Sequence, residues 1–125
     1  MEPEFLNWDE VLYLHARSLA EHGGTDGVRD RGLVESALNQ PKNDFYYGGV
    51  DLFGMAAAYA FHIAQAQAFL DGNKRTAIAS ALSFLTLNGV QTNGGGSEIY
   101  AAMIAIAEHR LDKAGLAALF RQLFA

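Results

Sequence analysis

Apolar residues recur along this chain every three or four positions, and glycine, proline or asparagine marks the breaks between runs. After Asn7, for example, Trp8, Val11, Leu12 and His15 fall on one face of a helix. Apolar and polar residues do not alternate over any long stretch, so the pattern predicts helices rather than strands. We predict six helical segments, over residues 7–22, 30–39, 51–68 and 73–88, with a fifth that begins at 97 and a sixth that begins at 112.

Local signals set the ends of these segments. Asn7 and Glu10 have the spacing of a capping box, and the glycines at 23 and 24 are expected to end the first helix. Pro41 is expected to stop the second helix, because the residue before a proline avoids the helical conformation. The aromatic and glycine-rich segment Lys42–Val50 is predicted to be an irregular flap or a short hairpin.

The predicted architecture is all-α, a compact bundle of about six helices with one short flap before the third helix. The fourth helix is apolar nearly all round, so it is expected to be buried on most sides and central. No internal repeat or long linker interrupts the chain, and residues 1–125 are expected to form a single domain.

Composition narrows the function classes. The chain has 125 residues, half of them apolar, and a formal net charge of −5, which argues against direct nucleic-acid binding. No apolar run approaches the ~20 residues that span a bilayer, and the acidic first residues lack the layout of a signal peptide. Since there is no cysteine, disulfides and thiolate metal sites are excluded, and we expect a protein of a reducing compartment such as the cytoplasm.

The most informative segment leads through a glycine turn into the apolar fourth helix. Its residues are Gln67, Ala68, Phe69, Leu70, Asp71, Gly72, Asn73, Lys74, Arg75 and Thr76. The first N–H groups of a helix lack intrahelical partners and, with the helix dipole, form an anion site. Two cations at this end, Lys74 and Arg75, are unfavourable by about 0.3–1 kcal/mol each unless an anion lies between them. The pattern therefore points to bound phosphate.

Asp71 extends this hypothesis to a metal. Mg²⁺ takes one or two carboxylates together with phosphate oxygens and water, so a carboxylate beside a phosphate is a natural ligand. The same residues also fit a plainer structure, since Asp-Gly-Asn is an ordinary turn and Lys74 and Arg75 suit a solvated surface. On the residues alone, a nucleotide-phosphate site and a plain turn both stay open.

The segment 67–76 resembles the signature of the Fic/Doc superfamily. That signature begins His-x-Phe, continues through an acidic and a small residue, and ends in Asn-Lys-Arg in the Doc (death-on-curing) branch. The AMP-transferring Fic branch has Asn-Gly in place of Asn-Lys. Here Phe69, Asp71 and the run Asn73–Thr76 are in step with the Doc form. The resemblance also includes Gly27–Asp30 and extends over roughly Leu6–Gly89.

This resemblance implies roles for the residues of the segment. Asp71 would hold Mg²⁺ and, with Arg75, belong to the catalytic residues. The phosphates of ATP would be bound by a contiguous set made up of Gly72, Asn73, Lys74, Arg75 and Thr76. Lys74, in place of the Fic glycine, favours phosphorylation over AMP transfer, which remains an alternative.

The resemblance also implies partners. Doc-type toxins move the γ-phosphate of ATP to a threonine of elongation factor Tu and so block translation in the bacterial cytoplasm. The predicted flap would dock that target by strand addition, with Phe45, Tyr46 and Tyr47 as contact residues, although these side chains equally suit the core. A separately encoded antitoxin would wrap the toxin with a disordered tail that folds on binding.

One position departs from the signature. Gln67 stands where the family keeps the histidine that acts as general base, and an amide cannot take a proton near neutral pH. His62 lies on another face of the third helix, and His15 on the apolar side of the first, so both are expected to be structural. We therefore expect an inactive or weakly active toxin, with a non-enzymatic pseudo-toxin as the alternative. Whether Gln67 is a natural or an introduced residue stays open.

Overall fold

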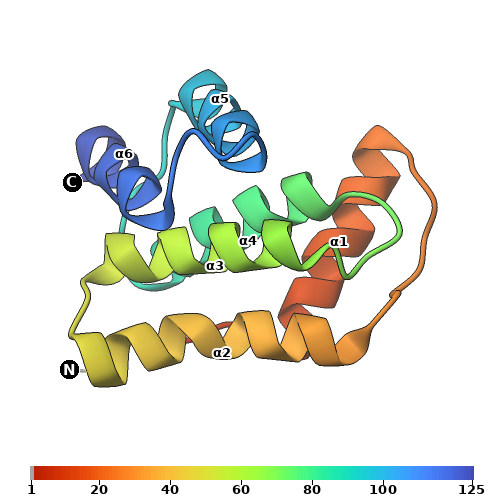
Figure 1. Cartoon of the computed structure of the whole chain (residues 1–125), viewed down its shortest axis with the longest axis horizontal. Helices are drawn as coiled ribbons and strands as arrows, with labels where there is room; N and C mark the ends of the chain where they lie inside the picture. The colour runs from red at the N-terminus through yellow and green to blue at the C-terminus, as the bar shows by residue number, and fades with distance from the viewer. Residues whose placement is uncertain (1) are drawn as a thin grey trace.

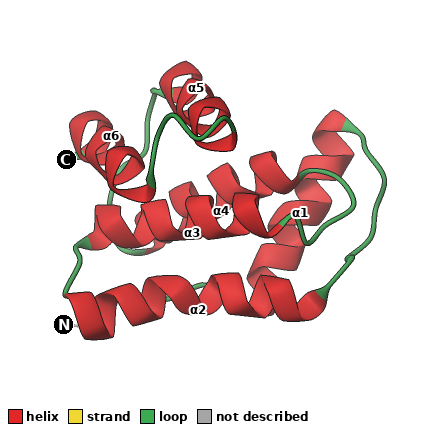
Figure 2. Ribbon diagram, viewed as in Figure 1, coloured by secondary structure: helices red, strands yellow, loops and turns green. Residues whose placement is uncertain are grey.

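The structure is a computed structural model that describes residues 2–125. Within that range it contains helices and loops, with a single isolated bridge in place of any strand (Figure 2). The helices are α1 (Trp8–His22), α2 (Arg31–Gly48), α3 (Leu52–Ala66), α4 (Asn73–Leu87), α5 (Gly96–Ala107) and α6 (Lys113–Phe124). The predicted all-α bundle is confirmed. No helix of this range is long and apolar enough to cross a membrane.

The helix at the centre of the bundle is α3 rather than α4. It packs against α2 on one side, against α4 on another, and against α5 and α6 on a third (Figure 1). The physical reason is its run of small residues, Ala56, Ala57, Ala58 and Ala60, all fully buried, which lets neighbours approach from every side. Helix α4 packs mainly against α3 and α1, and its outer face, which includes Ile78 and Leu82, is half-buried.

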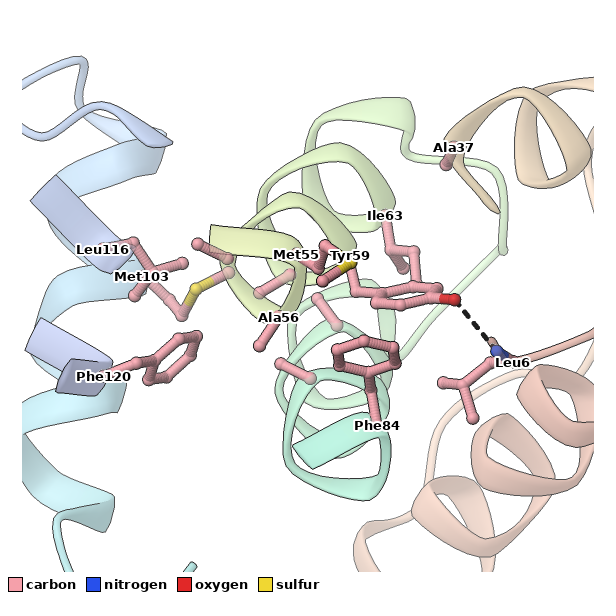
Figure 3. Close-up of a cluster of buried hydrophobic side chains, with 14 of the residues drawn as sticks. Leu6, Ala37, Met55, Ala56, Tyr59, Ile63, Phe84, Met103, Leu116 and Phe120 are labelled. Atoms are coloured by element: carbon pink, nitrogen blue, oxygen red, sulfur yellow. Dashed lines mark hydrogen bonds between the residues drawn. The ribbon is translucent and has the colours of Figure 1, made fainter. Parts of the chain in front are cut away.

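Aliphatic and aromatic side chains together fill the space between these helices (Figure 3). Tyr59 of α3 and Phe84 of α4 are fully buried, with ring centroids 5.0 Å apart. The Tyr59 hydroxyl accepts a hydrogen bond of 2.9 Å from the backbone N–H of Leu6. Burial raises the pKa of the Tyr59 phenol far above its usual value, so the group stays protonated. This contact ties the segment before α1 to the core.

Four of the helix starts carry the side-chain caps that their sequences predict. Asn7 and Glu10 form the expected capping box, and Asp30, Asp51 and Asp112 each accept from a backbone N–H in the first turn. Helices α4 and α5 are different, because each follows a glycine with positive φ and has no side-chain cap. The uncapped start of α4 is the segment that the sequence singled out.

The predicted flap over residues 42–50 does not form. Helix α2 continues through Pro41 to Gly48 and ends at Gly49 in the left-handed conformation. An interior proline costs a helix about 3 kcal/mol, but Pro41 is itself buried, and Ala37, Leu38 and Phe45 on the same helix pack in or against the core. Packing of this face outweighs the local penalty.

Candidate functional site

The site is built where two loops from distant parts of the chain run side by side. Residues 23–30, here called the α1–α2 loop, lie antiparallel to residues 67–72, the motif loop, through the bridge between Val28 and Phe69. On one side of this bridge the Leu70 N–H donates to the Gly27 carbonyl at 3.1 Å. On the other, the Arg29 N–H donates to the Ala68 carbonyl at 2.6 Å. The α1–α2 loop therefore fixes the backbone of the motif loop.

The contact between the loops is close enough to require glycine. Gly27 has φ 146°, and a Cβ placed there would lie 2.6 Å from Leu70 Cδ1. A Cβ at Gly24 would lie 3.2 Å from the Cβ of Asp71. In addition, the N–H of Thr25 donates to Asp71 Oδ2 at 2.9 Å. The α1–α2 loop thus holds both the backbone and the key carboxylate of the motif loop.

His15 of α1 packs against the motif loop on its buried side. Its ring stacks on Phe69 with centroids 4.0 Å apart, and its Nε2 lies 2.8 Å from the Asp71 carbonyl oxygen, which can only accept. His15 is 2% exposed. The expectation of a structural histidine is confirmed, and its role is specific: α1 positions the loop that carries Asp71.

Asn73 closes the motif loop from the other end. Its side-chain oxygen accepts from the Phe69 N–H at 3.0 Å, and its side-chain nitrogen donates to the Phe69 carbonyl at 2.9 Å. Because both ends of the amide are used in this way, the Asn73 side chain fixes the conformation of the motif loop. Only the backbone N–H of Asn73 is then left to bind a ligand.

The start of α4 opens into a cleft of about 400 Å³. Its walls are Gln67, Leu70, Asp71, Gly72, Asn73, Lys74, Arg75 and Tyr100. Gly72 has φ 78°, which aims the following N–H groups outward without a side-chain cap. Neither Lys74 nor Arg75 takes part in an ion pair within residues 2–125. Two unneutralised cations and free N–H groups therefore face one cleft.

The structure places Thr76 apart from these residues. Its side chain is fully buried, and its N–H donates to the Gly72 carbonyl at 2.9 Å as the first bond of the helix. Of the predicted phosphate-binding set, Gly72 to Arg75 line the cleft and Thr76 does not. Helical geometry explains this, because the inward face of α4 begins at that position.

Gln67 lies at the end of α3 and faces the same cleft. It is the C-cap residue of that helix, with φ 50° and ψ 38°, a left-handed conformation that is uncommon for a residue with a side chain. Its side-chain nitrogen donates to the Ala64 carbonyl at 2.9 Å. The position of the family histidine is thus exposed and adjacent to the cations, but it holds an amide.

The predicted target-docking residues lie elsewhere. Phe45, Tyr46 and Tyr47 sit in the last turns of α2, at the start of α3, whereas the motif loop follows the end of α3 (Figure 1). Phe45 packs against the core, and Tyr47 is 89% exposed. The flap that was expected to carry these residues is replaced by helix, because α2 continues through Pro41, and their role in docking a target stays a prediction. The segment beside the site is the α1–α2 loop.

Three features of the site escaped sequence reasoning. The contact of the α1–α2 loop with the motif loop joins residues about 40 positions apart, and only the glycines at 23, 24 and 27 hinted at a close approach. The role of His15 depends on the same contact. Tyr100 comes from α5 and enters the cleft from a part of the chain with no motif.

Comparison with known proteins agrees with this geometry. A family model described as the Fic/DOC family matches residues 5–85, more than half of the chain. The chain belongs to the Fic/DOC family. Among its Doc-type relatives, Protein kinase doc of Escherichia phage P1 is 38% identical over 84 residues, 66% of this chain and 67% of that protein. Toxin Doc of Mycolicibacterium smegmatis is 45% identical over 92 residues, 70% of this chain and 67% of that protein.

Proposed function

We propose that this Doc-type chain is a toxin scaffold for transfer of the γ-phosphate of ATP to a threonine hydroxyl of elongation factor Tu. The observation that carries the proposal is the uncapped start of α4, where Lys74 and Arg75 line one cleft with Asp71. One relative is named a protein kinase and the other a toxin, which supports the same reaction class.

The cleft suits the charge of a nucleotide. Phosphoryl transfer depends mainly on positioning and on stabilising charge at the phosphates, and the N–H groups after Gly72 together with Lys74 and Arg75 supply both. Without an anion, the two cations oppose the helix dipole by about 0.3–1 kcal/mol each. A polyphosphate turns this unfavourable arrangement into a binding site.

Asp71 fits Mg²⁺ only together with the nucleotide. Residues 2–125 contain no group of three His, Cys, Asp or Glu side chains able to hold a metal, so an ion at Asp71 would need phosphate oxygens and water among its ligands. Mg²⁺ is commonly bound by one carboxylate, phosphate oxygens and water. Thr25 holds Asp71 Oδ2, which directs the carboxylate and leaves its other oxygen for the ion. When bound, Mg²⁺ neutralises charge that develops on the phosphates.

Gln67 limits the chemistry. Its amide can orient a hydroxyl by a hydrogen bond but cannot remove the proton, and loss of a general base typically lowers the rate by about 10²–10⁴-fold. We propose that the chain binds ATP and transfers phosphate weakly or not at all.

We propose that the α1–α2 loop docks the target. In an antiparallel pair whose flanking residues make the hydrogen bonds, the residue between them directs its own N–H and carbonyl away from its partner strand. Val28 is that residue, and it is 39% exposed. An extended target segment can therefore add at this edge and bring its hydroxyl to the motif loop.

The first test restores the base. Gln67→His is expected to raise transfer of label from γ-labelled ATP to elongation factor Tu by about 10²-fold or more, because the variant regains a general base and keeps the proposed phosphate and metal ligands. The same change combined with Asp71→Asn should remove this gain. If Gln67→His transfers no label while binding ATP, the assigned reaction is wrong. Transfer of an AMP adduct, recognised by its mass, would instead establish the AMP-transferring alternative.

The second test concerns docking. Val28→Pro in the Gln67→His background removes the outward N–H, and proline is tolerated at a strand edge that faces solvent. We expect at least a tenfold rise in KM for the protein target with an unchanged KM for ATP. Tyr47 lies in the last turn of α2, away from the motif loop. Tyr47→Ala in the same background should leave the KM for the protein target and the KM for ATP unchanged. Equal target KM for Val28→Pro and its parent would contradict docking at this edge.

Gln67 also favours a second candidate, a non-enzymatic pseudo-toxin. Such a protein would sequester a cognate antitoxin whose disordered tail folds on binding, and it would need no general base. It predicts tight antitoxin binding, measured by calorimetry, with no transfer even in Gln67→His. Phosphate transfer by Gln67→His would instead support the toxin and exclude the pseudo-toxin.

A further inference from the structure

Tyr100 is the one residue that α5 contributes to the cleft at the start of α4. The ammonium of Lys74 lies 5.5 Å from the centroid of its ring. The residue is 51% exposed, although it belongs to a helix whose Ile99 and Met103 are buried in the core. A large aromatic side chain is thus held at the rim of the cleft rather than packed away.

The lining of the cleft divides into two chemical parts. Asp71, Lys74, Arg75 and the backbone around Gly72 are polar and suit phosphate and metal. Leu70 and Tyr100 are apolar or aromatic, and both are about half exposed, at 46% and 51%. A polyphosphate alone would use only the first part. The second part provides a surface for an uncharged, planar group that is attached to the phosphates.

A cation–π contact with Lys74 is by itself a sufficient role for an exposed tyrosine. That role accounts for the position of the ring but requires no ligand. The two roles differ in consequence, because a ring that only holds Lys74 would affect every phosphate ligand alike.

We propose that Tyr100 is the stacking surface for the base of the nucleotide. The inference rests on the proposed function, since it assumes that phosphates bind at the start of α4. In a nucleoside triphosphate the base is separated from the nearest phosphate by one ribose. The contact between Lys74 and Tyr100 places a phosphate-binding cation and an aromatic ring at neighbouring positions. Stacking is tolerant of base identity, because every base has a π face.

The test compares two ligands that share phosphates and differ in the base. Affinities of ATP–Mg²⁺ and of inorganic tripolyphosphate–Mg²⁺ are measured by calorimetry for the unaltered chain, Tyr100→Ala and Tyr100→Phe. We expect Tyr100→Ala to bind ATP about 5- to 100-fold more weakly and to bind tripolyphosphate within twofold of the unaltered chain. Tyr100→Phe should keep the ATP affinity. Tyr13→Ala, an exposed tyrosine of α1 outside this cleft, serves as the control.

Two outcomes would overturn the inference while the proposed function stands. In the first, Tyr100→Ala weakens both ligands equally, which assigns the ring to Lys74 alone. In the second, Tyr100→Ala changes neither affinity. Failure of the unaltered chain to bind either ligand would overturn both proposals together. Tyr100→Leu, which keeps apolar surface without a π face, guards against misfolding: it should retain the fold, as measured by thermal unfolding, and lose ATP affinity.

Discussion

At the scale of single residues, the motif loop shows a division of labour that its sequence does not reveal. Both ends of the Asn73 amide form hydrogen bonds with the backbone of Phe69. The His15 ring stacks on Phe69 and forms a hydrogen bond with the Asp71 carbonyl. These residues set the shape of the loop. Lys74 and Arg75 form no ion pair within residues 2–125, so the shape of the loop and the charge beside it come from different side chains.

Removal of His15 is expected to destabilise the fold. His15→Ala loses a buried hydrogen bond, worth about 0.5–1.5 kcal/mol, and leaves a void against Phe69. We expect the free energy of unfolding, measured in urea, to fall by about 2–4 kcal/mol. His22→Ala, at the exposed end of α1, should cost no more than about 1 kcal/mol. Equal losses for the two variants would contradict a supporting role for His15.

At the scale of elements, the helices were predicted where local signals agree with packing. The capping residues Asn7, Asp30, Asp51 and Asp112 acted as their chemistry dictates. The sequence predicts too short an α2, because the penalty of Pro41 is local and can be read from the sequence. The burial that outweighs this penalty depends on packing against α3. The loop pairing at Val28 was missed for the same reason: it is a contact between distant segments.

Three helices also meet at a cluster of titratable groups. Lys113, at the start of α6, is 2.8 Å from Asp44 of α2, and its ammonium donates to His62 Nε2 of α3 at 3.1 Å. Burial, followed by the charge of Lys113, lowers the pKa of His62, and Asp44 partly opposes this. His62 is therefore held neutral as a hydrogen-bond acceptor.

This cluster predicts a pH dependence of stability. Since the folded pKa of His62 lies below the unfolded value of about 6.5, the unfolded chain takes up the proton first as pH falls. The stabilisation is present above about pH 6.5 and is lost as pH falls toward the folded pKa. We expect His62→Gln, which keeps an acceptor, to flatten the fall of the urea midpoint between about pH 7.5 and pH 5.5.

A matched variant isolates this effect. His22→Gln removes a histidine outside this cluster and is the control for the loss of an imidazole as such. If His62→Gln and the unaltered chain show parallel curves, the cluster does not link proton binding to folding.

At the scale of the whole molecule, α3 is the centre of the packing, and its length sets the distance between two segments. Its small residues let four helices pack around it, and its two ends separate the aromatic turns of α2 from the motif loop (Figure 1). The sequence motif located the cleft at the start of α4, because the residues from Gly72 to Arg75 that line it are contiguous. The α1–α2 loop and Tyr100 could not be located, because only the packing of α1 and α5 brings them there.

The exposed setting of Gln67 has an evolutionary consequence. The residue is the C-cap of α3 in the left-handed conformation, and its exposed side chain makes one local hydrogen bond, to the Ala64 carbonyl, so a histidine at this position disturbs no buried packing. Codons for glutamine and histidine differ only in the third base. Any gene that encodes this chain therefore lies one nucleotide change from the family histidine at position 67. Histidine can therefore be gained or lost at position 67 independently of the residues that build the fold.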